Sequence, residues 1–75
     1  MPNKKIKYYA RPNKIKVAAI MKGTTLKQLA EDVSTNYNAL VMIAGRKNAT
    51  SKLRAQVIAN SLDVKFEDLF EAVEQ

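Results

Sequence analysis

The segment from Thr25 to Arg46 constrains the fold of this chain more than any other, because it encodes two short helices joined by a tight break. Thr25 is a typical helix N-cap, and Gln28 three residues later completes the pattern of a capping box. The polar break at residues 34–36 is so short that the two helices must cross steeply, which is the helix-turn-helix arrangement. Apolar residues recur at helical spacing on both sides of the break: Leu26, Leu29, Ala30 and Val33, then Leu40, Ile43 and Ala44.

Length and composition exclude most other classes of protein. Seventy-five residues make one domain, close to the lower limit for a self-sufficient core. The absence of cysteine and histidine excludes disulfides, the usual zinc sites and thiol or imidazole catalysis. Gly23 and Gly45 fit helix ends and form no phosphate-binding loop. We therefore expect no enzyme activity, no cofactor, no metal and no small-molecule substrate.

The chain offers no segment for a membrane. No apolar run approaches the roughly 20 residues needed to span a bilayer. Charged residues interrupt the N-terminal region, so it contains no signal-peptide apolar stretch. We expect a cytoplasmic protein that does not bind membranes.

Charge is distributed unevenly along the chain. Residues 1–16 hold six basic residues and no acid, and residues 46–54 hold four basic residues and no acid. Residues 63–75 hold five acids against Lys65. This polarity indicates a basic face that meets phosphate and an acidic end turned away from it, with a merely solubilising surface as the alternative.

The periodicity predicts an all-α, compact bundle of about five helices in residues 13–75, preceded by a basic arm in residues 1–12. The predicted helices span residues 14–22, 25–33, 36–44, 51–62 and 66–73, with Asn13 as the first N-cap and Gly23 and Gly45 as helix ends. The arm contains IKYYA, which is rich in β-forming residues and can form a short strand. The fourth helix is expected to turn four residues inward: Leu53, Val57, Ile58 and Leu62.

Three stretches follow one another along the chain: KGTTLKQLAEDV, ALVMIAGRK and IANSLDVKFEDLF. In this order they resemble the lambda-repressor and Cro-like (xenobiotic-response-element type) family of helix-turn-helix domains, and the resemblance covers residues 14–70. It implies a bundle of about five helices that binds operator DNA, usually as a homodimer. Many members of the family are regulators in phages and other mobile elements.

The chain departs from the family pattern at two turns. Ser34 stands where the turn between the two motif helices usually has glycine, and Asp63 stands where glycine usually precedes the last helix. Both positions are expected to adopt a left-handed backbone, which asparagine and aspartate tolerate better than serine. Lys65 occupies the N-cap site of the last helix, so that cap is weak or supplied by Asp63.

Matching the family motif places Asn36, Tyr37 and Asn38 at the start of the recognition helix, where side chains reach base edges first. Asn38 is the best candidate for reading sequence, because asparagine can pair with N6 and N7 of adenine. Tyr37 can contact a phosphate or a thymine methyl group, and Met42 can contact a thymine methyl group. Each has an alternative role: Asn36 as a helix cap, Tyr37 as a shield for the turn and Met42 as a core residue.

Phosphate contacts are expected on both sides of the recognition helix. The start of the second helix can present Thr25 and Lys27 to a phosphate. Arg46 and Lys47 follow the recognition helix directly, and Lys52 and Arg54 extend the basic track. Such contacts give affinity and salt dependence without choosing a sequence.

The basic arm has three alternative arrangements. Its basic residues Lys4, Lys5, Lys7 and Arg11 can lie in a minor groove. Ile6, Tyr8 and Tyr9 can instead order the arm by packing on the domain, or the arm can pair as a strand across a dimer. We favour packing of the arm over an apolar stripe on the first helix, with a dimer contact second; that stripe comprises Val17, Ile20 and Met21.

These features predict a protein that binds double-stranded DNA and regulates transcription, as a repressor that occupies its operator. Phe70 and Val73, or the stripe on the first helix, are candidates for a homodimer contact. The recognition helix has no charge from residue 38 to residue 44, and Val41 lies on its outer side. The alternative is therefore a protein-interaction module, such as an anti-repressor or adaptor, on the same scaffold.

Overall fold

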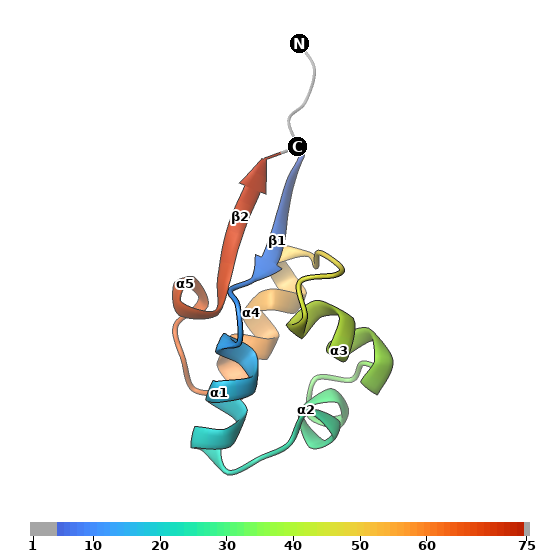
Figure 1. Ribbon diagram of the computed structural model, residues 1–75, viewed down its shortest axis with the longest axis vertical. Helices are drawn as coiled ribbons and strands as arrows, with labels where there is room; N and C mark the ends of the chain where they lie inside the picture. The colour runs from blue at the N-terminus through green and yellow to red at the C-terminus, as the bar shows by residue number, and fades with distance from the viewer. Residues whose placement is uncertain (1–4, 75) are drawn as a thin grey trace.

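The computed structural model describes residues 5–74, which form a mostly helical domain with a small sheet. The helices form a compact body, and the two strands run side by side out of it toward the chain ends (Figure 1). The helical fold class and the five helices are confirmed. Within residues 5–74, no helix is long and apolar enough to cross a membrane. The elements are β1 (Ile6–Ala10), α1 (Lys14–Lys22), α2 (Leu26–Asp32), α3 (Tyr37–Ala44), α4 (Lys52–Ser61), α5 (Phe66–Leu69) and β2 (Phe70–Glu74).

The core is one apolar cluster to which all five helices and both strands contribute. Alanines at the helix contacts let the backbones approach closely. The ring centroid of Phe66 lies 5.3 Å from that of Tyr8 and 5.9 Å from that of Phe70. These ring contacts join α5 to both strands. The largest fully buried side chains are Phe70, Ile15, Leu29, Leu40, Ile58 and Leu69.

The inward face of α4 differs from the prediction. The buried residues repeat at i, i+3, i+4 and i+7: Ala55, Ile58, Ala59 and Leu62. Leu53 and Val57 are each two residues from the buried Ala55. Two residues correspond to a rotation of about 200° around the helix axis, so both side chains face away from the core. Leu53 is 77% exposed and Val57 is 40% exposed, and their prediction as core residues was wrong.

The first four helices follow their predicted limits because their ends are fixed by local contacts. The hydroxyl Oγ1 of Thr25 accepts a hydrogen bond from the backbone N–H of Gln28 at 3.1 Å, and Ser51 caps α4 in the same way. The side chain of Gln28 donates to Asp32 at 2.9 Å, so the reciprocal half of the capping box is not formed. Asn13 stands at the N-cap position of α1, as predicted, but it adopts a left-handed conformation and its side chain makes no cap hydrogen bond.

The C-terminal segment was predicted as one helix over residues 66–73, and this was wrong. Helix α5 ends at Leu69, and the chain continues as β2, antiparallel to β1. The register pairs Ala10 with Phe70 and Ile6 with Glu74, which buries Ala10 and Phe70 in the core. Phe70 is only 1% exposed and therefore cannot supply the dimer surface proposed for it.

The arm is ordered as β1 at the residues predicted for a strand, and it pairs within its own chain. Tyr8 and Thr50 also exchange backbone hydrogen bonds of 3.3 and 2.8 Å, which hold the other edge of β1. The arm does not cover the stripe on α1, where Ile20 is 68% and Met21 is 84% exposed, so the favoured packing was wrong. Lys4 lies outside the described residues.

Within residues 5–74, four non-glycine residues have a left-handed backbone, and two of them were predicted. Ser34 (φ 56°) and Asp63 (φ 57°) confirm the expectation at the two turns. Asp63 pairs with Lys22 and does not cap α5, whose N-cap Lys65 makes no side-chain cap bond. Gly45 ends α3 as predicted but is not left-handed, and the next residue, Arg46, has φ 60°.

Replacement of Ser34 by glycine should stabilise the domain. Glycine removes the steric cost of a left-handed backbone, and the net gain should be about 0.5–1 kcal/mol after its greater loss of chain entropy. Ser61→Gly, in the right-handed last turn of α4, is the matched control and should destabilise the domain. Urea denaturation of both variants measures this, and a loss of stability in Ser34→Gly would contradict a strained turn.

Candidate nucleic-acid interface

Helices α2 and α3 form a helix-turn-helix with a turn closed by backbone hydrogen bonds. The N–H of Ser34 donates to the carbonyl oxygen of Glu31 at 3.2 Å, and the N–H of Thr35 donates to that of Ala30 at 2.9 Å. The inward faces of both helices are buried, with Leu29 on α2 and Leu40 on α3 fully covered. The turn and the core together fix the direction of α3.

The outer face of α3 is exposed and carries the residues predicted to meet bases. Tyr37 is 49% exposed, Val41 and Met42 are each 38% exposed, and Asn38 is also exposed. These residues fall on one side of the helix, because positions four apart lie one above the other. The alternative in which Met42 is a core residue is excluded by this exposure. Whether these side chains read bases stays a prediction.

Asn36 has a structural task. Its side-chain oxygen accepts a hydrogen bond from the backbone N–H of Ala39 at 2.6 Å, and its backbone is extended, as an N-cap requires. The cap role that the sequence offered as an alternative is therefore present. Only the amide NH₂ group of Asn36 remains for a base.

The start of α2 lies beside the start of α3. Thr25, Leu26, Lys27 and Tyr37 line one shallow hollow on the surface. The hydroxyl of Thr25 caps α2, whereas Lys27 is exposed. The structure therefore brings two of the predicted phosphate-binding residues next to a predicted base-reading residue.

The start of α4 lies beside the helix-turn-helix turn. Nη1 of Arg54 donates a hydrogen bond to Oγ1 of Thr35 at 2.7 Å, which ties α4 to the turn before α3. Lys52 is exposed, and within residues 5–74 no carboxylate pairs with it. Arg54 thus helps to position α3, while the charge of Lys52 faces solvent.

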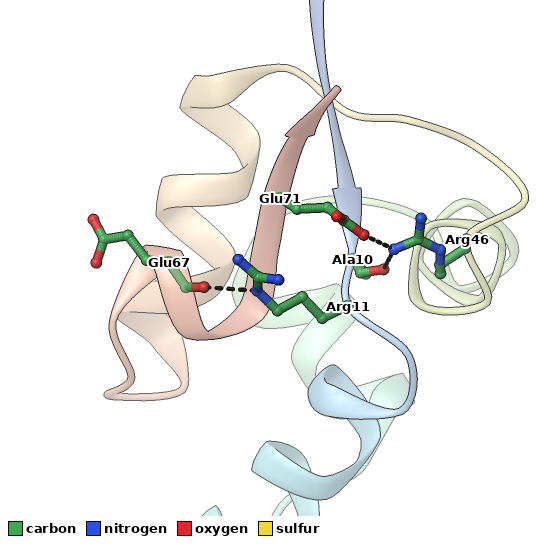
Figure 2. A network of polar contacts seen from close by, with 5 residues as sticks. All are labelled: Ala10, Arg11, Arg46, Glu67 and Glu71. Carbon is green, nitrogen blue, oxygen red and sulfur yellow. Dashed lines mark hydrogen bonds and ion pairs between the residues drawn. The ribbon is translucent and has the colours of Figure 1, made fainter. Parts of the chain in front are cut away.

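Arg46 links the end of α3 to both strands (Figure 2). Its Nη1 atom donates to the carbonyl oxygen of Ala10 at 2.8 Å and pairs with the carboxylate of Glu71, and its guanidinium lies 5.8 Å from the ring centroid of Tyr9. Both charged side chains are about one-third exposed. The predicted phosphate contact by Arg46 is untested, but its charge is already compensated by Glu71. This network was not predicted from the sequence, because Glu71 was assigned to a helix.

Arg11 makes a second link, between the end of β1 and α5 (Figure 2). Its Nε atom donates to the backbone oxygen of Glu67 at 2.8 Å, and its backbone N–H donates to that of Leu69 at 2.7 Å. Arg11 was a candidate for the minor-groove arm, and here it holds α5 in place. Of the arm lysines that the structure describes, Lys5 and Lys7 are exposed on or next to β1.

Only part of the acidic end of the chain lies away from α3, because Glu71 on β2 pairs with Arg46 next to the end of that helix. Helix α5, with Glu67 and Asp68 in its first turn, stands on the opposite side of the helical body from α3 (Figure 1). The exposed acids Glu31 and Asp32 are exceptions, at the end of α2. The charge polarity of the sequence is thus largely a polarity of the folded surface.

Comparison with solved structures finds a protein of similar fold. No family model matches the chain, and no curated protein matches it. The chain is similar to the crystal structure of a protein from Bacteroides fragilis described as a "putative DNA-binding protein", with a TM-score of 0.72 and 23% sequence identity. The match covers 85% of this chain and 98% of the other. At this identity the likeness establishes a shared fold.

Removal of the Arg46 side chain should destabilise the domain. Arg46→Met keeps most of the aliphatic stem but leaves the carbonyl oxygen of Ala10 and the carboxylate of Glu71 without their donor, at a cost of about 1–2 kcal/mol for a pair that is one-third exposed. Lys47→Met, one residue further along, is the control and should change stability little.

A double-mutant cycle with Glu71→Gln isolates the ion pair. The coupling between Arg46→Met and Glu71→Gln should be about 0.5–1 kcal/mol in urea denaturation. Strictly additive losses would show that the pair contributes nothing to stability.

Proposed function

We propose that this protein binds double-stranded DNA in a sequence-specific manner and represses transcription by occupying its operator. The observation that carries the proposal is the outer face of α3, which is exposed and begins with Tyr37 and Asn38 beside the exposed Lys27. The fold shared with the Bacteroides fragilis protein and the resemblance to the lambda-repressor and Cro-like family agree with this role. Occupancy of an operator would block the access of polymerase.

In this mechanism α3 enters the major groove with its first turn against the bases. Asn38 would read adenine through its amide, and Tyr37 would contact a phosphate or a thymine methyl group. Val41 and Met42 continue the same exposed face and would pack against thymine methyl groups. The site is therefore expected to be rich in A·T pairs.

The flanking basic residues would hold the DNA backbone. Lys27 at the start of α2 and Lys47 and Lys52 beyond the end of α3 are exposed and free to meet phosphates. Arg54 and Arg46 are bonded within the protein, so we assign them mainly to the positioning of α3. Two copies bound to adjacent half-sites, as a homodimer, would match the usual arrangement of the family.

A protein-interaction module remains the second candidate. The exposed Val41 and Met42, together with Tyr37, form a largely apolar strip on α3 without a charged residue. Such a strip also fits a groove on another protein. In that case the molecule would be an anti-repressor or adaptor that keeps the fold.

Selection from random duplex pools at two salt concentrations separates the two functions. A DNA-binding regulator should enrich a defined site and bind it more weakly at the higher salt concentration, because phosphate contacts release counterions. The absence of both enrichment and salt-sensitive binding would reject the DNA-binding function and favour the protein-interaction module.

Two single variants test the assigned roles on the enriched site. Asn38→Ala should reduce discrimination at one base position by about 1–3 kcal/mol. Lys52→Gln should weaken all sites alike and flatten the plot of log affinity against log salt by about one unit. The assignment fails if Lys52→Gln changes the preferred sequence while Asn38→Ala does not.

A further inference from the structure

A polar hollow lies on the surface between β1 and the loop that joins α3 to α4. Its lining includes Lys7 and Tyr9 from the strand and Lys47, Asn48 and Ser51 from the loop. The two lysines are distant in the sequence and become neighbours of one hollow only in the fold. The hollow adjoins α3, since the loop begins where that helix ends.

Backbone hydrogen bonds hold the walls of this hollow in place. The N–H groups of Lys47 and Asn48 both donate to the carbonyl oxygen of Met42, at 3.0 and 3.2 Å, which folds the loop back onto the end of α3. Tyr8 and Thr50 exchange two backbone hydrogen bonds, which attach the far end of the loop to β1. The position of the hollow is therefore fixed relative to α3.

The hollow carries uncompensated positive charge. Lys7 and Lys47 are both exposed, and within residues 5–74 neither pairs with a carboxylate. Lys7 and Tyr9 share one face of the sheet because strand residues two apart point the same way. Glu71 lies opposite Tyr9 in the register and is the acid of β2 on that face. Its carboxylate forms an ion pair with Arg46.

We infer that this hollow binds one phosphodiester group of the DNA backbone, just beyond the bases that α3 contacts. Lys7 and Lys47 supply charge from two walls, and the amide of Asn48 supplies a neutral donor. Strand β1 thereby becomes part of the DNA-binding surface, through the sheet and not as a free arm in a minor groove. This inference rests on the proposed function, because duplex DNA supplies the ligand.

The salt dependence of DNA binding tests whether Lys7 and Lys47 of the hollow contact a phosphate. Lys7→Gln and Lys47→Gln should each flatten the slope of log affinity against log salt by about one unit, and the double variant by about two. Lys65→Gln, beyond α4 and outside the hollow, is the matched control and should keep the wild-type slope. Lys47→Arg retains the positive charge and should therefore also show the wild-type slope. Thermal denaturation confirms that each variant is folded.

Neutral linkages in the DNA locate the contact. Duplexes with a single methylphosphonate, moved along the backbone, should include one position that weakens the wild type and has no further effect on the double variant. A separate NMR titration uses inorganic phosphate alone. Saturation of Lys7 and Lys47 by inorganic phosphate, with wild-type DNA slopes in both glutamine variants, would indicate a free-anion site and overturn the assignment to DNA.

The outcomes separate this inference from the proposed function. Wild-type protein that shows no salt-dependent DNA binding would overturn both. Wild-type protein that binds a defined site, together with a Lys7→Gln variant of unchanged slope, would overturn the two-lysine site and leave the DNA-binding function standing. A flattened slope in Lys7→Gln and Lys47→Gln but not in Lys65→Gln would support the site.

Discussion

The antiparallel pairing of β1 with β2 is the constraint on which the rest of this structure depends. It joins the two ends of the described chain and buries Ala10 and Phe70 at the centre of the core. It also brings the carbonyl of Ala10 and the carboxylate of Glu71 to the same guanidinium, that of Arg46 at the end of α3. The direction of α3 is therefore tied to a sheet built from the N-terminal and C-terminal segments.

Arginine and lysine residues have different tasks in this small domain. Arg11, Arg46 and Arg54 each donate to a fixed oxygen within the protein, which suits the planar and directional guanidinium group. The exposed lysines Lys27, Lys47 and Lys52 instead make no ion pair within residues 5–74. Among the three arginines, within the same residues, only the charge of Arg46 is offset by a carboxylate, that of Glu71, whereas Arg11 and Arg54 bond to neutral oxygens and keep their charge.

The sequence predicted best what is decided by neighbours along the chain. The limits of α1 to α4 agree closely with the prediction, since Thr25, Asn36 and Ser51 cap helices through bonds that span only three residues. It failed where a long-range partner overrides local preference. Residues 70–73 continue a helical pattern in sequence, but β1 offers them a full row of hydrogen bonds and Phe70 a place in the core.

The sequence by itself determined the helix-turn-helix, the strand propensity of IKYYA, the left-handed turns at Ser34 and Asp63, and the exposed start of α3 at Tyr37 and Asn38. Only the tertiary structure decided that β1 pairs with β2 and that the α1 stripe stays uncovered. Only the fold assigned Arg46 to Glu71 and placed Lys7 beside Lys47. The physical reason is that helix caps and turns are satisfied within a few residues, whereas a strand and an ion pair are completed by a segment elsewhere in the chain.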